Sequence, residues 1–287
     1  MNHLIEKALY KANDHSALKN RKQIQGGSIN KSYYVETEAN RYFIKYHTDA
    51  PDNFFRLEAE GIELIRSTDS IAVPEIVAFS DEEKEGFLMM EWVEGRKTQK
   101  TAGMLGDHIA KMHQTFGEQH GFYQDTFIGL LPQPNGLFTS WLEYYRDQRL
   151  RAQLQLGVRQ NAITGKRRDR LENLLGKLEK WIPEKVDPSY LHGDLWGGNW
   201  LVGQGGIPCV IDPSFLYGDR HFELAFTELF GGYSGEFYEV YKERFPLADY
   251  YEEIKALYQL YYLLVHLNIF GEGYGNAVDS ILKRYVG

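Results

Sequence analysis

The chain has 287 residues, of which 43% are hydrophobic and 14% aromatic, enough apolar side chain for one large domain or two lobes. Asp and Glu total 40 against 32 Lys and Arg, and the formal charge of −8 argues against nucleic acid or anionic membrane as a partner, because both attract clustered positive charge. The single cysteine, Cys209, excludes an intramolecular disulfide and a CxxC zinc site. The first residues do not resemble a signal peptide and no apolar run is long enough to span a bilayer, so we expect a reduced, cytoplasmic protein without membrane contact.

The first third of the chain carries a mixture of helical and β patterns. Apolar residues recur at helical spacing in two segments, and runs rich in Tyr, Val and Ile lie between and after them. In chain order, we predict a helix over 3–18, strands at 32–37 and 41–47, a helix over 52–67, and extended segments at 73–79 and 87–93.

Beyond about residue 95 the pattern is mostly helical. Predicted helices cover 102–116, 139–156, 165–181, 222–230 and 250–269. A glycine-rich segment of strands and loops at 190–212 interrupts this half. We therefore expect an α+β protein with a small β-rich N-lobe over residues 1–94 and a larger, mainly helical C-lobe over 95–287.

The interrupting segment contains residues that phosphoryl transfer requires. Asp194 lies on a tight loop and Asn199 follows five residues later, the interval of the kinase pattern H-x-D-x-x-x-x-N. Two short strands, at 200–202 and 208–211, surround a Gly-Gln-Gly-Gly turn and would return the chain so that Asp212 faces Asn199. One carboxylate beside the attacking hydroxyl, and a carboxylate plus an amide oxygen for magnesium, are what this chemistry needs. An isolated His-Gly-Asp is usually only a turn, but the joint spacing predicts a kinase that uses ATP and Mg²⁺.

Elements upstream fit a nucleotide site in the same order as in kinases. Phe43-Ile44-Lys45 resembles the strand that carries the phosphate-binding lysine. The next helix offers Glu58 or Glu60 as the partner of Lys45, and we expect Glu58. A turn between strands supplies the phosphate-covering candidates Gly26, Gly27 and Ser28. An apolar strand that runs into a polar stretch predicts an adenine-binding hinge at Met90, Glu91, Trp92 and Val93.

Together these residues resemble the fructosamine kinases (ketosamine-3-kinases), within the aminoglycoside-phosphotransferase-like kinases, and so predict a protein-kinase-like two-lobed fold. The resemblance covers roughly residues 20–275. It is carried by GGSIN at 26–30, FIK at 43–45, SWLEYYRDQRL at 140–150, HGDLWGGN at 192–199, IDPSFLYGDRHFELA at 211–225 and FTELFGGY at 226–233.

The resemblance implies a reaction and a role for each matching residue. Asp194 would be the catalytic base, Asn199 and Asp212 the magnesium ligands, and Lys45 the phosphate lysine. The implied reaction is ATP-dependent phosphorylation of the 3-hydroxyl of a ketosamine, a product of amine glycation. The phosphorylated adduct is unstable and releases the amine, so the implied activity is deglycation. Trp196 could form a wall of the sugar pocket or act as a core plug.

Two positions depart from the family pattern. Ser28 stands where many relatives carry Cys, so a redox switch at that position is not expected. His221 stands where relatives usually carry an acidic residue, and its role is left open. His192 is interpreted as a structural brace of the catalytic loop.

Two other functions are weighed against a ketosamine kinase. An aminoglycoside site would gather carboxylates to bind a polycation, whereas acidic residues here are scattered and the predicted substrate helix over 139–156 contains Arg146, Arg149 and Arg151. A kinase for choline or another small alcohol or amine stays possible. A nucleotide-binding pseudokinase is disfavoured because the predicted catalytic residues are all present, and a protein kinase because Pro213 follows Asp212.

Overall fold

The computed structural model describes residues 2–24, 30–82 and 85–287. The chain forms two compact units. The first unit comprises Met1–Leu105 and Asn199–Pro213, and the second comprises Gly106–Gly198 and Ser214–Gly287. The predicted boundary after residue 94 thus lies inside the first unit, and a segment of the C-terminal half returns to that unit.

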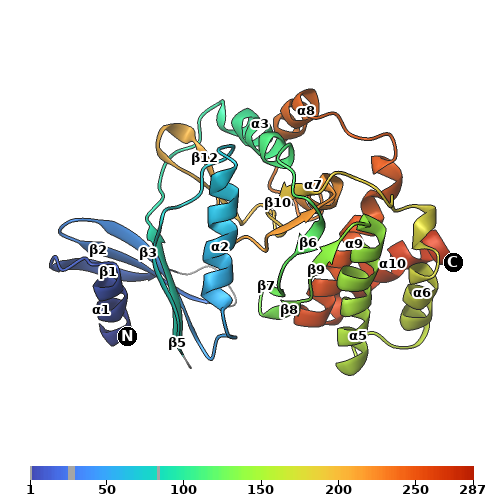
Figure 1. Cartoon of the computed structure of the whole chain (residues 1–287), viewed down its shortest axis with the longest axis horizontal. Coiled ribbons are helices and arrows are strands. Elements are labelled where there is room, and N and C mark those ends of the chain that lie inside the picture. Colours follow the sequence, from blue (N-terminus) through green and yellow to red (C-terminus); the bar gives the residue numbers. More distant parts are fainter. Residues whose placement is uncertain (1, 25–29, 83–84) are drawn as a thin grey trace. The chain divides into compact units, whose positions relative to one another are not determined.

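The first unit is built on an antiparallel five-stranded sheet with the order β1-β2-β3-β5-β4 (Figure 1). Its strands are β1 Leu18–Ile24, β2 Lys31–Thr37, β3 Arg41–Thr48, β4 Ile76–Glu82 and β5 Glu85–Glu91. Strand β1 was not predicted, because its sequence LKNRKQI is polar and lacks the apolar–polar alternation of a half-buried strand. In the structure, nearly all of its residues are exposed. The other four confirm the predicted β segments within a few residues.

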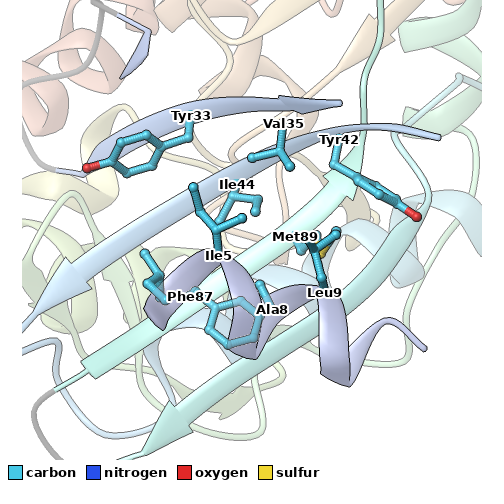
Figure 2. Packing of buried hydrophobic residues seen from close by; sticks show 10 residues of the cluster. Ile5, Ala8, Leu9, Tyr33, Val35, Tyr42, Ile44, Phe87 and Met89 are labelled. Carbon is cyan, nitrogen blue, oxygen red and sulfur yellow. The ribbon is translucent and has the colours of Figure 1, made fainter. Parts of the chain in front are cut away.

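Helix α1 (Asn2–Lys11) covers one face of this sheet. Figure 2 shows its side chains Ile5, Ala8 and Leu9 directed at apolar residues of the strands. The full cluster consists of Leu4, Ile5, Ala8, Leu9, Tyr33, Val35, Tyr42, Ile44, Phe87 and Met89. The helix ends earlier than the predicted residue 18, because Asn13 takes a left-handed backbone conformation (φ 54°) that a helix cannot continue through.

The other face of the sheet carries helix α2 (Phe54–Ser67), as Figure 1 shows. Side chains alternate between the two faces of a strand, so Ile44 in β3 faces α1 and its neighbour Lys45 faces α2. Two strands from the returning segment complete this unit, β11 (Trp200–Val202) and β12 (Pro208–Val210). Helix α3 (Thr101–His113) begins in the first unit and ends in the second.

The second unit contains short strands that were not predicted individually. Strands β6 His120–Phe122, β9 Gly136–Phe138, β10 Ser189–Leu191 and β13 Leu216–Gly218 form a sheet in the order β10-β13-β6-β9, and β7 Thr126–Ile128 pairs with β8 Leu131–Gln133. Three residues are too few to display a period of two, which is why most of these strands escape a search for alternation.

Helices form the rest of the second unit. They are α4 Trp141–Tyr144, a π-helical segment Tyr145–Arg151, α5 Ala152–Arg159, α6 Gly165–Leu175, α7 Arg220–Thr227, α8 Gly235–Arg244, α9 Tyr251–Phe270 and α10 Gly275–Val286, with 3-10 turns at Leu178–Lys180 and Glu272–Tyr274. All five predicted helices are confirmed, although the one over 139–156 contains the π segment. Helices α8 and α10 were missed. Over the described residues, no helix combines the length and the apolarity needed to cross a membrane.

Candidate active site

The charged centre of the first unit is the ammonium group of Lys45. Its Nζ lies 2.6 Å from Oε1 of Glu58 in α2 and also contacts Oδ1 of Asp212, which follows β12. The side chains of Lys45 and Glu58 are only 6% and 12% exposed, whereas that of Asp212 is 36% exposed. Burial alone would lower the pKa of Lys45, but the neighbouring carboxylates outweigh it and raise that pKa, so Lys45 is a cation.

Between the two acidic candidates on α2, the structure pairs Lys45 with Glu58. Glu60 instead forms an ion pair with Arg56 on its own helix, at 3.0 Å. Burial raises the pKa of Glu58 and Lys45 counteracts that rise. Lys45, Glu58 and Asp212, separated by up to 167 positions in the chain, thus form one charged cluster, in which Asp212 is the partly exposed member.

The β11–β12 hairpin brings Asn199 and Asp212 to its open end. Trp200 pairs with Val210, and the N–H of Ile211 donates to the carbonyl of Asn199 at 3.0 Å. This is the predicted hairpin with its predicted turn. Asp212 itself adopts φ 60°, a left-handed conformation that Asp and Asn adopt more readily than other non-glycine residues.

The predicted hinge residues lie at the end of β5 and just after it: Met90, Glu91, Trp92 and Val93. Two of their backbone donors already have acceptors, since Glu91 N–H donates to Glu75 O and Trp92 N–H to Arg41 O. Among the described residues, no backbone acceptor binds the N–H of Val93. Only that donor of the last three is therefore available to an adenine edge.

Two parts of the first unit remain, the predicted phosphate-covering residues and the single cysteine. Gly26, Gly27 and Ser28 lie outside the described residues. Cys209 lies in β12 and is 3% exposed, and burial raises the pKa of its thiol to about 12. Burial therefore shields this thiol and disfavours its reactive thiolate form.

In the second unit, the loop that leads into Asp194 has every backbone group of residues 192 and 193 bonded. Glu223 in α7 accepts the N–H of His192 at 3.2 Å and the N–H of Gly193 at 2.5 Å. Ser214 N–H donates to the carbonyl of His192 at 2.9 Å, and the Tyr262 hydroxyl donates to the carbonyl of Gly193 at 3.0 Å. This arrangement leaves the two residues before Asp194 no freedom to shift without breaking a buried hydrogen bond.

Gly193 permits the approach of these partners. Its φ is 82°, and a Cβ there would lie 1.9 Å from the carbonyl oxygen of Ser214. The fully buried His192 accepts the N–H of Asp194 on Nδ1 at 3.3 Å, so it braces the loop as predicted. Asp194 is the first residue after this fixed segment and is half-buried.

The carboxylate of Glu223 is itself fully buried, and no Lys or Arg of the described residues forms an ion pair with it. Nε2 of His113 donates to it at 2.8 Å, and Nδ1 of the same ring accepts from the Tyr241 hydroxyl at 2.8 Å. Burial lowers the pKa of His113, so this ring is a neutral donor. Our reading of the sequence missed Glu223. Its one signal is a carboxylate inside the otherwise apolar run Phe222–Phe226.

Trp196 lies on the surface of the second unit, 43% exposed. Its ring covers Gly198, where a Cβ would approach the ring to 2.4 Å. A ring this exposed does not fill the protein core. A wall of the sugar pocket therefore stays the predicted role of Trp196. Gly197 packs on Gly232, where a Cβ would lie 2.6 Å from the Gly197 Cα. The WGG and FGG motifs therefore meet backbone to backbone.

His221 has a structural environment. It is buried, bonds the carboxylate of Asp219 at 2.7 Å through Nδ1, and accepts the N–H of Ala248 on Nε2 at 3.2 Å. Asp219 also caps helix α7 by accepting the N–H of His221. His221 thus joins the start of α7 to the segment before α9, a role that requires no contact with substrate.

Comparison with known proteins agrees with these motifs. A model of the fructosamine kinase family matches residues 1–287. The chain is 34% identical over 264 residues to the "probable ketoamine kinase" of Enterococcus faecium, covering 91% of this chain and 94% of that one. It is also 34% identical over 269 residues to the chloroplastic protein-ribulosamine 3-kinase of Oryza sativa subsp. japonica, covering 92% of this chain and 78% of the rice protein.

Solved structures show the same fold. A Thermobifida fusca protein assigned as a fructosamine-3-kinase superimposes with a TM-score of 0.89 at 29% identity, covering 99% of this chain and 98% of that one. The aminoglycoside phosphotransferase APH(4)-Ia superimposes with a TM-score of 0.66 at 17% identity, with full coverage of both chains, which shows a shared kinase-like α+β fold. The chain therefore belongs to the fructosamine kinase family, whose members are ATP-dependent phosphotransferases.

Proposed function

We propose that this protein transfers the γ-phosphoryl group of ATP to the 3-hydroxyl of a ketosamine, with Mg²⁺ as the cofactor metal and deglycation of an amine as the outcome. Membership of the fructosamine kinase family supports the substrate class. The observation that carries the site assignment is the Lys45 ammonium, held between Glu58 and Asp212 from distant parts of the sequence. A lysine between two carboxylates is the arrangement by which kinases hold the phosphate lysine close to a metal-binding aspartate.

The nucleotide would contact the first unit through backbone groups and Lys45. Lys45 would bind phosphate oxygens while Glu58 keeps its ammonium group in place. The hinge Met90–Val93 would bind the adenine edge, with the N–H of Val93 as the donor. The loop that contains Gly26, Gly27 and Ser28 would cover the phosphates.

A magnesium site at Asp212 and Asn199 fits the donors present. Over the described residues, no three His, Cys, Asp or Glu side chains cluster as a ready-made metal site, so phosphate oxygens and water would have to complete the coordination. That is the usual manner in which Mg²⁺ binds beside a nucleotide. Asp212 meets the requirement for a hard oxygen ligand, since its partly exposed carboxylate contacts Lys45 through Oδ1 and no hydrogen bond within the described part of the chain reaches Oδ2. Magnesium would supply neutralisation of phosphate charge.

Asp194 would act as the general base. Its carboxylate would accept the proton of the 3-hydroxyl as that oxygen bonds to the γ-phosphorus, while the bond to the bridging oxygen of ADP breaks. Base catalysis depends on a fixed position, and the bonded backbone of His192 and Gly193 provides it. The exposed ring of Trp196, two residues further on, would pack against the C–H groups of the sugar.

The decisive experiment is a screen for ADP release with ribulosyl-lysine, fructosyl-lysine, erythrulosyl-lysine, choline and an aminoglycoside as acceptors. We expect turnover with at least one ketosamine. Phosphorus NMR should place the phosphate on the 3-hydroxyl, and free lysine should appear as the product decays. Turnover of choline or the aminoglycoside, with no turnover of any ketosamine, would refute the proposal that the acceptor is a ketosamine. The assignment as a kinase would still stand. If no acceptor in the screen supports ADP release, the result would favour a pseudokinase.

A further inference from the structure

Arg149 belongs to the π-helical segment Tyr145–Arg151, where a continuous α-helix was expected. π-helical turns are rare and frequently mark functional sites. Of the three arginines in the predicted substrate helix, Arg146 and Arg151 pair with Asp147. Arg149 is fully buried, so its charge is not on the helix surface.

The guanidinium of Arg149 is held without any carboxylate partner among the described residues. Nη1 donates to Pro134 O at 2.7 Å and to Gln148 O at 3.2 Å, and Nη2 donates to Asn135 Oδ1 at 2.9 Å and contacts the Tyr144 hydroxyl. Nε is buried without a partner. A buried cation that has only neutral partners is costly, so its presence calls for a role beyond stability.

Two of the groups that Arg149 binds, Pro134 O and Asn135 Oδ1, belong to the short connection at residues 133–135 (the 133–135 turn), which begins at the last residue of strand β8. One chain of contacts leads from this turn through β7. Asn135 Nδ2 donates to Thr126 Oγ1 at 2.9 Å, and the next residue, Phe127, accepts the Ser214 hydroxyl on its carbonyl at 2.8 Å. The N–H of Ser214 is the donor to the carbonyl of His192.

A second chain of contacts leads from the same turn through α9. Gln133 Oε1 accepts the Tyr261 hydroxyl at 2.8 Å, and the ring of Tyr261 lies 5.8 Å from the guanidinium carbon of Arg149. The next residue, Tyr262, donates its hydroxyl to the carbonyl of Gly193. Both chains therefore end on the two carbonyl groups that immediately precede Asp194.

We infer that Arg149 is a positioning residue for the catalytic loop. Its rigid fork fixes the 133–135 turn, and the turn fixes Ser214 and Tyr262, the donors that hold the carbonyls of His192 and Gly193. A lysine cannot replace it fully, because a single ammonium group does not present two parallel pairs of donors. The expected effect of Arg149 on catalysis rests on the proposed function of Asp194 as the general base.

The test compares Arg149→Met and Arg149→Lys with the native chain. We expect kcat of the Met variant to fall between ~10-fold and ~10²-fold, the scale of a misplacement near 1 Å, with ATP affinity retained and partial recovery in the Lys variant. Amide hydrogen exchange should accelerate over residues 190–196 and not in β3 or β5. The exchange measurement needs no substrate, so it tests the loop even if no ketosamine is turned over.

Arg167→Met is the matched control. Arg167 is a largely buried arginine of the same unit, and it binds Glu272 and Asp279 outside these chains of contacts. Its loss should raise exchange in α6 and α10 and leave kcat unchanged. A folded Arg149→Met variant with native kcat and native exchange at 190–196 would overturn the inference, as would acceleration spread evenly over both units.

Tyr261→Phe provides a gentler variant in case Arg149→Met does not fold. It removes only the hydroxyl that reaches Gln133. We expect a kcat several-fold lower and no further loss when it is combined with Arg149→Lys, because residues of one network are not additive. Fully additive losses would contradict a shared route to the loop.

Discussion

The two units of this protein hold their proposed chemical groups by different means. In the first unit, Lys45, Glu58 and Asp212 are fixed by charge, and an ammonium group can exchange one oxygen partner for another. In the second unit, the backbone of His192 and Gly193 is fixed by hydrogen bonds: Glu223 accepts from both N–H groups, and Ser214 and Tyr262 donate to the two carbonyl groups. The first arrangement suits groups that must accept a nucleotide and a metal. The second suits a base that must not move.

The largest effect is expected where the charged cluster would meet the metal. Asp212→Ala should abolish turnover even at saturating ATP, because the Mg²⁺ of phosphoryl transfer would lose its carboxylate ligand. Steady-state ADP release at several Mg²⁺ concentrations measures this, and excess EDTA should stop the native chain. Asp52→Ala, at an exposed position of the same unit, should be silent. Full activity of the native chain in EDTA would contradict the assignment.

The next effect belongs to the base of the second unit. Asp194→Asn should lower kcat at least ~10²-fold, within the range of general-base catalysis. ATP affinity, measured by calorimetry, should be retained, because Asp194 has no proposed contact with nucleotide. Near-native kcat in this variant would remove Asp194 from the mechanism.

A smaller effect, on both kcat and stability, is expected from replacing Glu223, which holds the loop that leads into Asp194. Glu223→Gln places an amide group against donors that need a carboxylate, so we expect unfolding free energy to drop by about 1–3 kcal/mol, the cost of a buried unsatisfied group. We also expect kcat to fall roughly 10-fold as the loop shifts. Thermal unfolding and kcat measure the two.

Glu228→Gln is its control. Glu228 lies at the end of the same helix and pairs with Lys255 on the half-exposed side. Its replacement should change stability slightly and kcat not at all. Equal losses of kcat in the two variants would show that the loop does not depend on Glu223 in particular.

Paired substitutions of the two acidic residues on α2, Glu58 and Glu60, test which of them supports Lys45. Glu58→Gln weakens a charge-assisted hydrogen bond to Lys45, and we expect the Kd for ATP to rise between about 5-fold and 10-fold. Glu60→Gln removes the charge that pairs with Arg56 and should leave that Kd unchanged. A larger effect from Glu60 would mean that Lys45 changes partner when nucleotide binds.

The smallest effect is expected from oxidant. Cys209 is buried in β12 and its pKa is raised to about 12, so little thiolate forms near neutral pH. Mild peroxide or diamide should leave specific activity unchanged and give no disulfide-linked dimer on a non-reducing gel. Reversible inactivation that dithiothreitol restores would show that Cys209 is accessible.

Local sequence determined the features that depend on short-range spacing. The β11–β12 hairpin follows from two short apolar runs around a Gly-rich turn, and the longest helix, α9, from a sustained apolar pattern. The spacing of Asp194, Asn199 and Asp212 is likewise a property of one short segment. These features could be predicted because the residues that specify each of them belong to one continuous segment of the chain.

Only the tertiary structure decided which distant groups became partners. Glu58 and Glu60 are two positions apart and so leave the helix in different directions, and the placement of α2 on the sheet selects Glu58. Glu223 and Arg149 appear in the sequence as ordinary charges on helices, yet both are buried. The burial of these charges is only weakly visible in the local sequence, because their partners come from other elements, as Gly193 does for Glu223.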